Sequence, residues 1–380
     1  MEERKFIHVS QPWLGVKEKE YVLDALSDAR ISSEGKYVNL FEESFASYVG
    51  RKYGVSVNNG TNALILALRA LDIEEGSEVI TPTFTIISCA LASIYNNLIP
   101  VFVDSSYETW NMKTEEIEAK ITKKTKAILM VHTYGYPCDV EKILKIAEKN
   151  NLFVIEDFAE AIGSEYKGKK CGSFGIISCT SFYSNKLITT GEGGMCLTDD
   201  EKIYERLKRL RNLSFIPEKR FLHYEIGFNF RLSNLLCAIG LAQLENIDER
   251  IKRKIKMAEI YYDILGELEE KGLINLPSRS NEDYKNTFWM YGIVIRNGVN
   301  AQKIMERLKR RGIETRPFFY PLHLQPAFRR FKWFSEQRLA TAEFIAEHGF
   351  YIPSGLNLDE SEIKYVGEIV KEEIIKSFES

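Results

Sequence analysis

Short apolar runs alternate with amphipathic segments through the first half of the chain. They predict strands at 53–57, 78–81, 101–103, 127–132 and 152–156, and helices at 16–30, 62–71, 87–95 and 141–149. The strands are almost continuously apolar, as strands are in sheets covered on both faces. Such strands separated by helices indicate a largely parallel α/β sheet. Ligands of these sheets bind at the carboxyl ends of the strands.

The pattern changes after residue 231. It predicts an apolar helix at 235–244, a long amphipathic helix at about 247–270, an extended segment at 287–295, a helix at 301–311, a proline-punctuated segment at 316–326 and two terminal helices. We predict an N-terminal arm and a large domain over 1–245. A linking helix and a small α+β domain are expected over 246–380. A chain of 380 residues is long enough for both.

Composition narrows the class of protein. Hydrophobic residues make up 44% of the chain and charged residues 28%, as in a globular protein, and the net charge of −3 gives no reason to expect nucleic-acid binding. The six cysteines include no C-x-x-C pair, so we expect no metal site and a reducing, cytoplasmic location. No signal core and no apolar run long enough to span a membrane is present.

A lysine in an unusual local sequence is the strongest chemical signal. Lys186 lies in SFYSNKLITTGEGG (181–194), among apolar, hydroxyl and small residues before a glycine-rich turn. A desolvated lysine amine loses proton affinity and becomes a usable nucleophile. Lysine is also the residue that carries pyridoxal 5′-phosphate (PLP) as a Schiff base. Most lysines are solvated, so Lys186 by itself would favour an ordinary, partly exposed side chain.

Four features with polar residues lie where strands are expected to end. Gly60 and Thr61 lie between a strand and a helix, where free N–H groups make an anion site; alternatively, the turn is a plain capped one. Asp157 follows a buried strand, so its carboxylate needs a partner such as a protonated pyridine nitrogen; a helix N-cap is the alternative. Ser181 could bind the same phosphate or be an ordinary strand serine. Asn229, among aromatics, is either a ligand contact or part of a turn.

The order and spacing of these features resemble one family. The chain resembles the PLP-dependent sugar aminotransferases of the DegT/DnrJ/EryC1/StrS group, which have the aspartate-aminotransferase fold (type I). Matching segments extend from 32–33 to 352–354 and include NGT at 59–61, EDFAEA at 156–161, SFYSNK at 181–186, GEGGM at 191–195 and FNFR at 228–231. The resemblance implies an α/β enzyme with a large, mostly parallel PLP-binding domain and a smaller C-terminal α+β domain.

The resemblance also implies roles for individual residues. Lys186 would carry PLP and move the proton, and Asp157 would pair with the pyridine nitrogen. Further cofactor contacts are expected from Gly60, Thr61, Ile86, Glu160, Ser181 and, from a second subunit, Asn229. Expected substrate contacts are Ser33, Phe318, Tyr320 and His323. A site completed by a neighbouring subunit implies an obligate symmetric homodimer.

Within the family, the resemblance is closest to the subgroup that makes GDP-perosamine for O-antigen lipopolysaccharide. The closer matches lie at 102–110, 131–135, 238–245 and 316–323. They imply transfer of the amino group of L-glutamate to GDP-4-keto-6-deoxy-D-mannose. A UDP- or dTDP-linked keto sugar is the alternative substrate.

The chain departs from the family pattern at a few positions. Ile86 stands where an aromatic residue usually stacks on the cofactor ring, so stacking is lost unless Phe84 replaces it. Ser184 replaces a usual glycine, Arg30 a usual tryptophan, and Ser354-Gly355 departs from the usual run. These positions bear on the sugar and the nucleotide rather than on the PLP chemistry.

Three other functions were weighed against the aminotransferase. A sugar dehydratase of the same fold has histidine in place of the lysine, so Lys186 argues against it. A non-enzymatic PLP-binding regulator would need an appended DNA-binding segment, and none is visible. A nicotinamide dehydrogenase would need a G-x-G-x-x-G after its first strand, and the chain lacks one.

Overall fold

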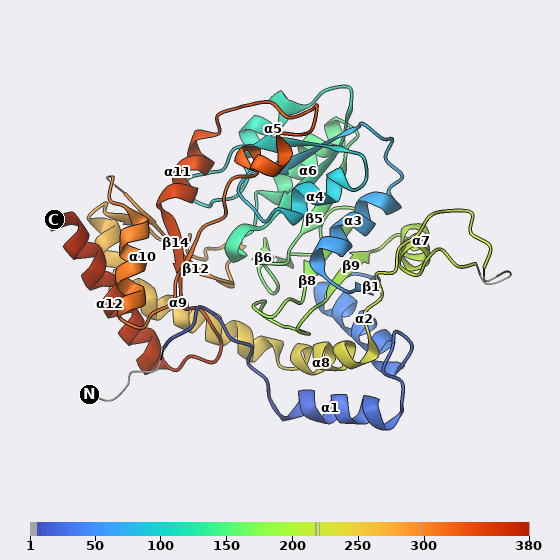
Figure 1. Cartoon of the computed structure of the whole chain (residues 1–380), viewed down its shortest axis with the longest axis horizontal. Helices are drawn as coiled ribbons and strands as arrows, with labels where there is room; N and C mark the ends of the chain where they lie inside the picture. The colour runs from blue at the N-terminus through green and yellow to red at the C-terminus, as the bar shows by residue number, and fades with distance from the viewer. Residues whose placement is uncertain (1–5, 217–218, 220, 297, 380) are drawn as a thin grey trace.

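A seven-stranded sheet forms the centre of the computed structural model, which describes residues 6–216, 219, 221–296 and 298–379 (Figure 1). Its strand order is β1-β9-β8-β5-β4-β2-β3. Only β9 runs antiparallel to its neighbours; the other adjacent pairs are parallel. The strands are β1 (Tyr53–Val57), β2 (Glu78–Pro82), β3 (Ile99–Val103), β4 (Thr125–Val131), β5 (Phe153–Asp157), β8 (Ile177–Ser181) and β9 (Gly194–Thr198).

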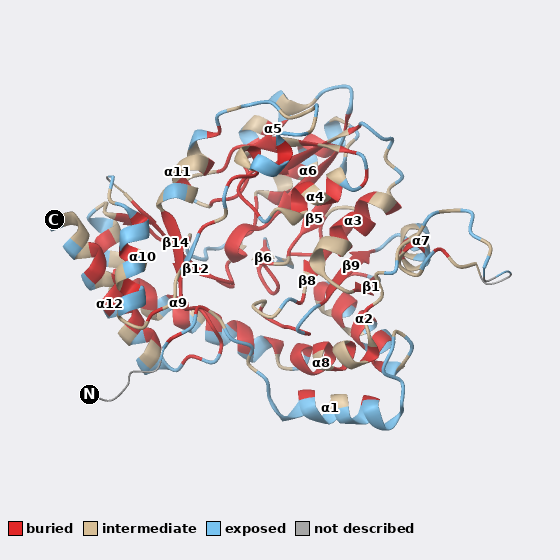
Figure 2. Ribbon diagram, viewed as in Figure 1, coloured by how far each residue is buried: buried red, intermediate tan, exposed pale blue. Residues whose placement is uncertain are grey.

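Helices cover both faces of this sheet because its strands are apolar on both sides. Within β4, Leu129 packs toward one layer, whereas Ile128 and Met130 pack toward the other. The first layer holds α3 (Gly60–Ala70), α4 (Ser88–Ile94) and α7 (Glu201–Arg211). The second holds α2 (Lys36–Val49), α5 (Thr114–Lys120), α6 (Val140–Lys149) and α8 (Asn234–Leu244). Figure 2 shows the buried residues concentrated between these layers.

The C-terminal part builds a second, smaller sheet. After α8 the long α9 (Ile247–Glu270) runs toward an antiparallel sheet of order β10-β12-β14-β13 (Figure 1). Its strands are β10 (Ile274–Asn275), β12 (Tyr291–Ile295), β13 (Arg316–Pro317) and β14 (Gly349–Ile352). The apolar residues of α9, β12, α10 (Ala301–Arg310) and α12 (Glu360–Glu379) share one core. The boundary between domains at residues 245 and 246 stays a prediction.

The remaining elements are peripheral. Helix α1 (Val16–Ser27) packs on α8 and is mostly exposed (Figure 2). Helix α11 (Ala340–His348) precedes β14, and a three-stranded sheet joins β11 (Tyr284–Lys285), β6 (Glu165–Tyr166) and β7 (Lys169–Lys170). Short 3-10 turns occur at Thr133–Gly135, Leu322–Leu324 and Pro326–Phe328. In the part of the chain described here, no helix is both long enough and apolar enough to cross a membrane.

Local backbone geometry explains where the sequence predictions differ from the structure. The helix predicted at 16–30 ends at Ser27, because Ala29 has a left-handed backbone with φ 55°. The extended segment predicted at 287–295 forms a strand only from Tyr291, and Phe288 has φ 52°. Helices α2 and α5 were not predicted, although α2 buries a regularly spaced aromatic face that includes Phe41 and Phe45.

Candidate active site

A cavity of about 650 Å³ lies at the carboxyl ends of the parallel strands. Its walls come from the start of α3, the ends of β5 and β8, and residues of the small sheet. Seven of the predicted residues line it: Gly60, Thr61, Ile86, Asp157, Glu160, Ser181 and Lys186. The topology of the large sheet therefore brings together residues that lie more than a hundred positions apart in sequence.

Lys186 is enclosed by one carboxylate and one aromatic ring. Its side chain is 10% exposed, and its Nζ lies 3.8 Å from Glu160 Oε1 and 3.7 Å from the centroid of the Trp289 ring. Burial lowers the pKa of the Lys186 amine, and the negative charge of Glu160 opposes that shift. Burial also raises the pKa of Glu160, to about 7, although its Oε2 accepts from the Tyr134 N–H. Burial therefore makes the Lys186 amine easier to deprotonate than the amine of an exposed lysine.

Asp157 is a buried carboxylate with room for a cation. It is the last residue of β5; its Oδ1 accepts from the Ala159 N–H at 3.0 Å and its Oδ2 from the Cys89 thiol at 3.5 Å. Burial raises the pKa of Asp157. No helix follows it in the described chain before α7, so the helix-cap alternative is wrong. A carboxylate desolvated to this degree is stabilised by a charged partner, such as a protonated ring nitrogen.

The start of α3 and the end of β8 make an anion cradle. Asn59, rather than Thr61, caps α3, because its Oδ1 accepts from the Asn62 N–H at 2.8 Å. The N–H groups of Gly60 and Thr61 belong to the first turn, which has no intrahelical partners for them. The Thr61 hydroxyl lies 2.7 Å from Ser88 Oγ, and Ser181 packs directly against the Gly60 turn. These donors suit a phosphate group.

The absence of a side chain at Gly60 lets the turn lie close to Ser181. A Cβ at Gly60 would lie 2.7 Å from the Ser181 Cβ. Overpacking of this kind costs about 1–3 kcal/mol, so Gly60→Ala should weaken PLP binding about tenfold or more. The measurement is absorbance titration of the apoenzyme with PLP. Gly266→Ala is the matched control, since its added Cβ would meet nothing nearer than 3.9 Å. Equal affinity in both variants would contradict the cradle.

Ile86, not Phe84, faces the cavity. Ile86 is 43% exposed and lines the cavity wall. Phe84 is fully buried and packs against the rings of Tyr134 and Phe318. Of the two residues that could pack on the cofactor ring, Ile86 faces the cavity and Phe84 does not.

Five predicted residues do not line the cavity. Phe318 is 5% exposed in an aromatic cluster, and His323 is buried with Nδ1 2.7 Å from Thr83 Oγ1 and Nε2 3.1 Å from Glu343. Their side chains support the wall rather than form it, so the prediction that they contact substrate has no support in this chain's geometry. Tyr320 is 56% exposed, and Ser33 and Asn229 also lie outside the lining.

Other residues line the cavity without having been predicted as site residues. They include Trp289, Arg316, Phe319 and Tyr351 from the C-terminal part. Arg316 and Phe319 belong to the same segment as the predicted Phe318 and Tyr320, so the sequence pointed to this segment but not to each side chain that lines the cavity. Trp289 and Tyr351 have no local motif, and only the packing of the small sheet places them here.

One further polar cluster lies outside the lining of the cavity. His132, Glu156 and Cys171 are close enough to suggest a metal site within the described residues. However, His132 Nδ1 accepts from the Cys138 N–H, and its Nε2 lies 2.9 Å from Glu156. Glu156 also accepts from the Phe174 N–H at 2.8 Å. These hydrogen bonds make the cluster a structural network.

Comparison with known proteins decides the family. Residues 12–371 match the model of the DegT/DnrJ/EryC1/StrS aminotransferase family. This chain belongs to that family. Its members are PLP-dependent aminotransferases, so the protein is an aminotransferase and its cofactor is PLP. The α/β fold of the aspartate-aminotransferase type is confirmed with it.

Relatives of this DegT/DnrJ/EryC1/StrS aminotransferase match over nearly its whole length. It is 44% identical to a GDP-perosamine synthase of Escherichia coli O157:H7, over 97% of this chain and 98% of that protein. It is 38% identical to a GDP-perosamine synthase of Caulobacter vibrioides, with 95% and 96% covered. The solved aminotransferase from Psychrobacter cryohalolentis superposes with a TM-score of 0.91 at 29% identity, covering 97% of this chain and 99% of the other.

The cavity of this aminotransferase fits its cofactor. The Gly60 turn has the close backbone approach that a phosphate requires, as the added-Cβ distance shows. The carboxylate of Asp157 is buried beside Cys89 with no cation bound to it among the described residues. The amine of Lys186 opens into the same space. The cavity therefore offers a group for each part of PLP: the Gly60 turn for the phosphate, Asp157 for the ring nitrogen and Lys186 for the aldehyde carbon.

Proposed function

We propose that this enzyme transfers the amino group of L-glutamate to a nucleotide-linked 4-keto-6-deoxy sugar. The specific reaction is GDP-4-keto-6-deoxy-D-mannose to GDP-perosamine. One observation carries the aminotransfer: the buried Lys186 amine faces the same cavity as the buried Asp157 carboxylate. The identity with GDP-perosamine synthases over nearly the whole chain supports the sugar and the nucleotide.

The chemistry divides among the residues of the cavity. Bound PLP supplies an electron sink for a carbanion beside the reacting nitrogen. The Asp157 carboxylate holds the proton on the ring nitrogen, which keeps that sink effective. Lys186 removes a proton from the α carbon of glutamate in one half-reaction and gives a proton to the sugar carbon in the other. Gly60, Thr61 and Ser181 bind the phosphate and fix the ring.

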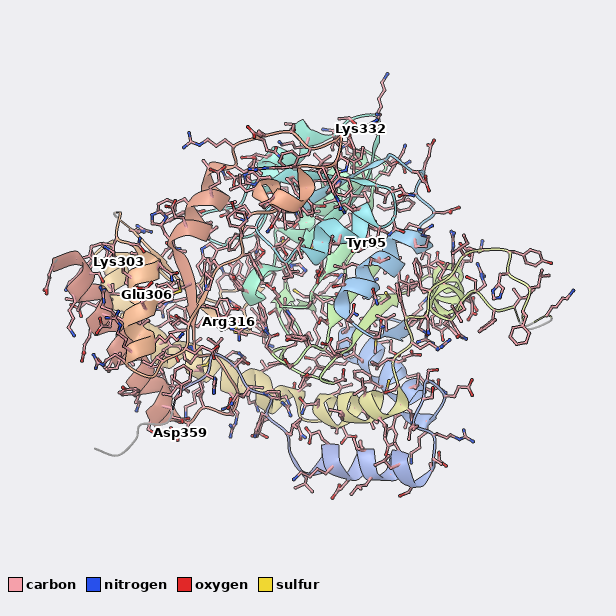
Figure 3. The ribbon with its side chains drawn as sticks, in the orientation of Figure 1. Tyr95, Lys303, Glu306, Arg316, Lys332 and Asp359 are labelled. Carbon is pink, nitrogen blue, oxygen red and sulfur yellow. The ribbon has the colours of Figure 1, made fainter. Side chains whose placement is uncertain are left out.

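The rim of the cavity suits acidic substrates. Arg316, labelled in Figure 3, belongs to β13 of the small sheet and lines the cavity. Its guanidinium is 3.3 Å from Glu314, and its side chain is 58% exposed, so it can turn toward a ligand. Glutamate carries two carboxylates and a nucleotide sugar carries a diphosphate, both of which pair well with arginine.

The nucleotide is tested by competition between donors. Product formation with L-glutamate should be at least about tenfold faster with the GDP-linked 4-keto-6-deoxy sugar than with UDP- or dTDP-linked ones, since a polar group left unpaired by the wrong base is costly. The measurement is kcat/KM for each sugar in parallel. A preference for a UDP- or dTDP-sugar would replace the substrate while leaving the aminotransfer intact.

We further propose that two copies complete each other's active sites. Asn229 is exposed and outside its own cavity, and nearby Phe221, Tyr224 and Ile226 are each more than 80% exposed. Exposed apolar residues grouped in this way suit a protein interface. The partner's Asn229 would then reach the phosphate cradle.

Mixing two inactive variants tests the shared site. Lys186→Ala and Asn229→Asp homodimers should each be inactive. After subunit exchange, each hybrid has one cavity with both native residues, so about a quarter of the native activity should return from random mixing of a C2 dimer. Exchange is followed by mass spectrometry of differently tagged chains. Hybrids that form without activity would contradict the shared site.

The cysteines support a cytoplasmic location for the enzyme. All six thiols are free and buried. Unpaired thiols persist in reducing compartments. We therefore propose that the enzyme acts in the cytoplasm, where nucleotide sugars would also have to be supplied.

A further inference from the structure

The free amine of Lys186 lies on the face of an indole ring. Its Nζ is 3.7 Å from the centroid of the Trp289 ring. The carboxylate of Glu160 lies 3.8 Å away. An ammonium at this distance from a tryptophan face is attracted by the negative face of the ring, most strongly when both are desolvated. Here Trp289 is 5% exposed and the Lys186 side chain 10%.

Trp289 is itself fixed at three points. Its Nε1–H donates to the Asn185 carbonyl at 2.8 Å, so one side chain holds both the lysine amine and the backbone just before the lysine. Its ring stacks on Tyr134, with centroids 5.8 Å apart. Its own carbonyl accepts from Lys254 Nζ at 2.6 Å.

Lys254 is an unusual anchor. It lies on α9, is 3% exposed, and donates to the carbonyls of Trp289 and Ser354. Within the described residues, no carboxylate forms an ion pair with Lys254. Burial alone lowers the pKa of Lys254 to about 7. Burying an amine without a counter-charge costs folding free energy. Here the Lys254 amine ties the segment that carries Trp289 to α9 and to the end of β14.

We propose that Trp289 is a positioning residue that holds the Lys186 amine whenever it is not bonded to the cofactor, and that Lys254 fixes Trp289 for this task. The inference rests on the proposed function of Lys186 as the proton carrier. During each half-reaction the nitrogen of the substrate would replace that of Lys186, which leaves the amine unbonded. The ring then keeps the amine inside the cavity and stabilises its protonated form against the effect of burial.

Competitive labelling measures the amine directly. Full-length enzyme, holding the cofactor as pyridoxamine phosphate so that Lys186 is unbonded, is acetylated with trace acetic anhydride at a series of pH values. The extent of acetylation at Lys186, read by peptide mass spectrometry against a free amine standard, gives its pKa. The other groups that act on this amine are Glu160, Asp157 and Cys89, and all stay unchanged in the variants.

The variants separate the ring from its N–H. Trp289→Leu removes the aromatic face and should lower the pKa of Lys186 by about one unit, because loss of a desolvated cation–π contact disfavours the ammonium. Trp289→Phe keeps a face and should shift the pKa by less than half as much. Lys254→Met should lower it in the same direction by loosening Trp289. Trp333→Leu is the control, since its ring packs on Phe331 instead.

The outcomes are distinct. A Lys186 titration in Trp289→Leu identical to that of the native enzyme would overturn the proposal. If that variant does not fold, as judged by its circular-dichroism melting curve, an unchanged titration in Lys254→Met would overturn it equally. The labelling uses no sugar substrate. Should Lys186→Ala retain full turnover, the proposed function would fail even with the Trp289 shift present.

Discussion

Lys186→Ala should lose turnover by at least about 10³-fold, because the change removes both the attachment point of the cofactor and the proton carrier. The variant should still bind PLP, without a covalent link, since the Gly60 cradle and Asp157 are intact. The measurement is amino-sugar formation from glutamate by chromatography, with bound PLP quantified by absorbance.

A surface lysine provides the control for this change. Lys208 is 41% exposed, and its ion pair with Glu205 and its contact with the Tyr204 ring both lie on its own helix. Lys208→Ala should therefore transaminate at the native rate. If Lys186→Ala also kept that rate, Lys186 would be a buried structural lysine and another residue would have to carry the cofactor.

Asp157→Asn should slow the glutamate half-reaction by about 100-fold. A carboxylate beside the ring nitrogen raises the pKa of that nitrogen by about 1–3 units, and a neutral amide carries no charge that could do so. The ring nitrogen then loses its proton, and the carbanion loses much of its stabilisation. Single-turnover absorbance with saturating PLP isolates this step from cofactor binding.

Asp200 gives a matched control for Asp157. It is the N-cap of α7, with its Oδ1 accepting from the Ile203 N–H at 3.0 Å. Asp200→Asn keeps a good cap residue and should leave the half-reaction unchanged. An equally unchanged rate in Asp157→Asn would mean that this carboxylate serves the fold and not the ring nitrogen.

The sequence predicted five of the seven strands of the central sheet, because those strands are largely apolar, whereas β8 and β9 were not predicted. The strand predicted at 53–57 coincides with β1. The strand predicted at 78–81 ends one residue before the end of β2, and the strand predicted at 152–156 begins and ends one residue before β5 does. The rule that ligands bind at strand carboxyl ends then placed Thr61, Asp157 and Ser181 in one site. Each lies next to the strand that positions it, so short-range sequence was enough.

The other wall of the cavity could not be read in this way. The segment at 316–323 has proline at two positions and no regular period, so nothing in it shows which side chains face inward. Phe319 lines the cavity, whereas Phe318 and His323 are buried behind it. Trp289 reaches Lys186 only because α9 and the small sheet pack beside the large one. The proposed role of Asn229 requires a second copy of the chain.

Borohydride reduction of the holoenzyme tests the central claim most directly. Reduction should fix the cofactor irreversibly on one lysine, and peptide mass spectrometry should find the phosphopyridoxyl group on the peptide that contains Lys186. Prior incubation with L-glutamate should prevent the labelling, because the amino group of glutamate displaces the lysine. Cofactor found on a different lysine, or none retained after reduction, would contradict the assignment of Lys186 and of the cavity around it.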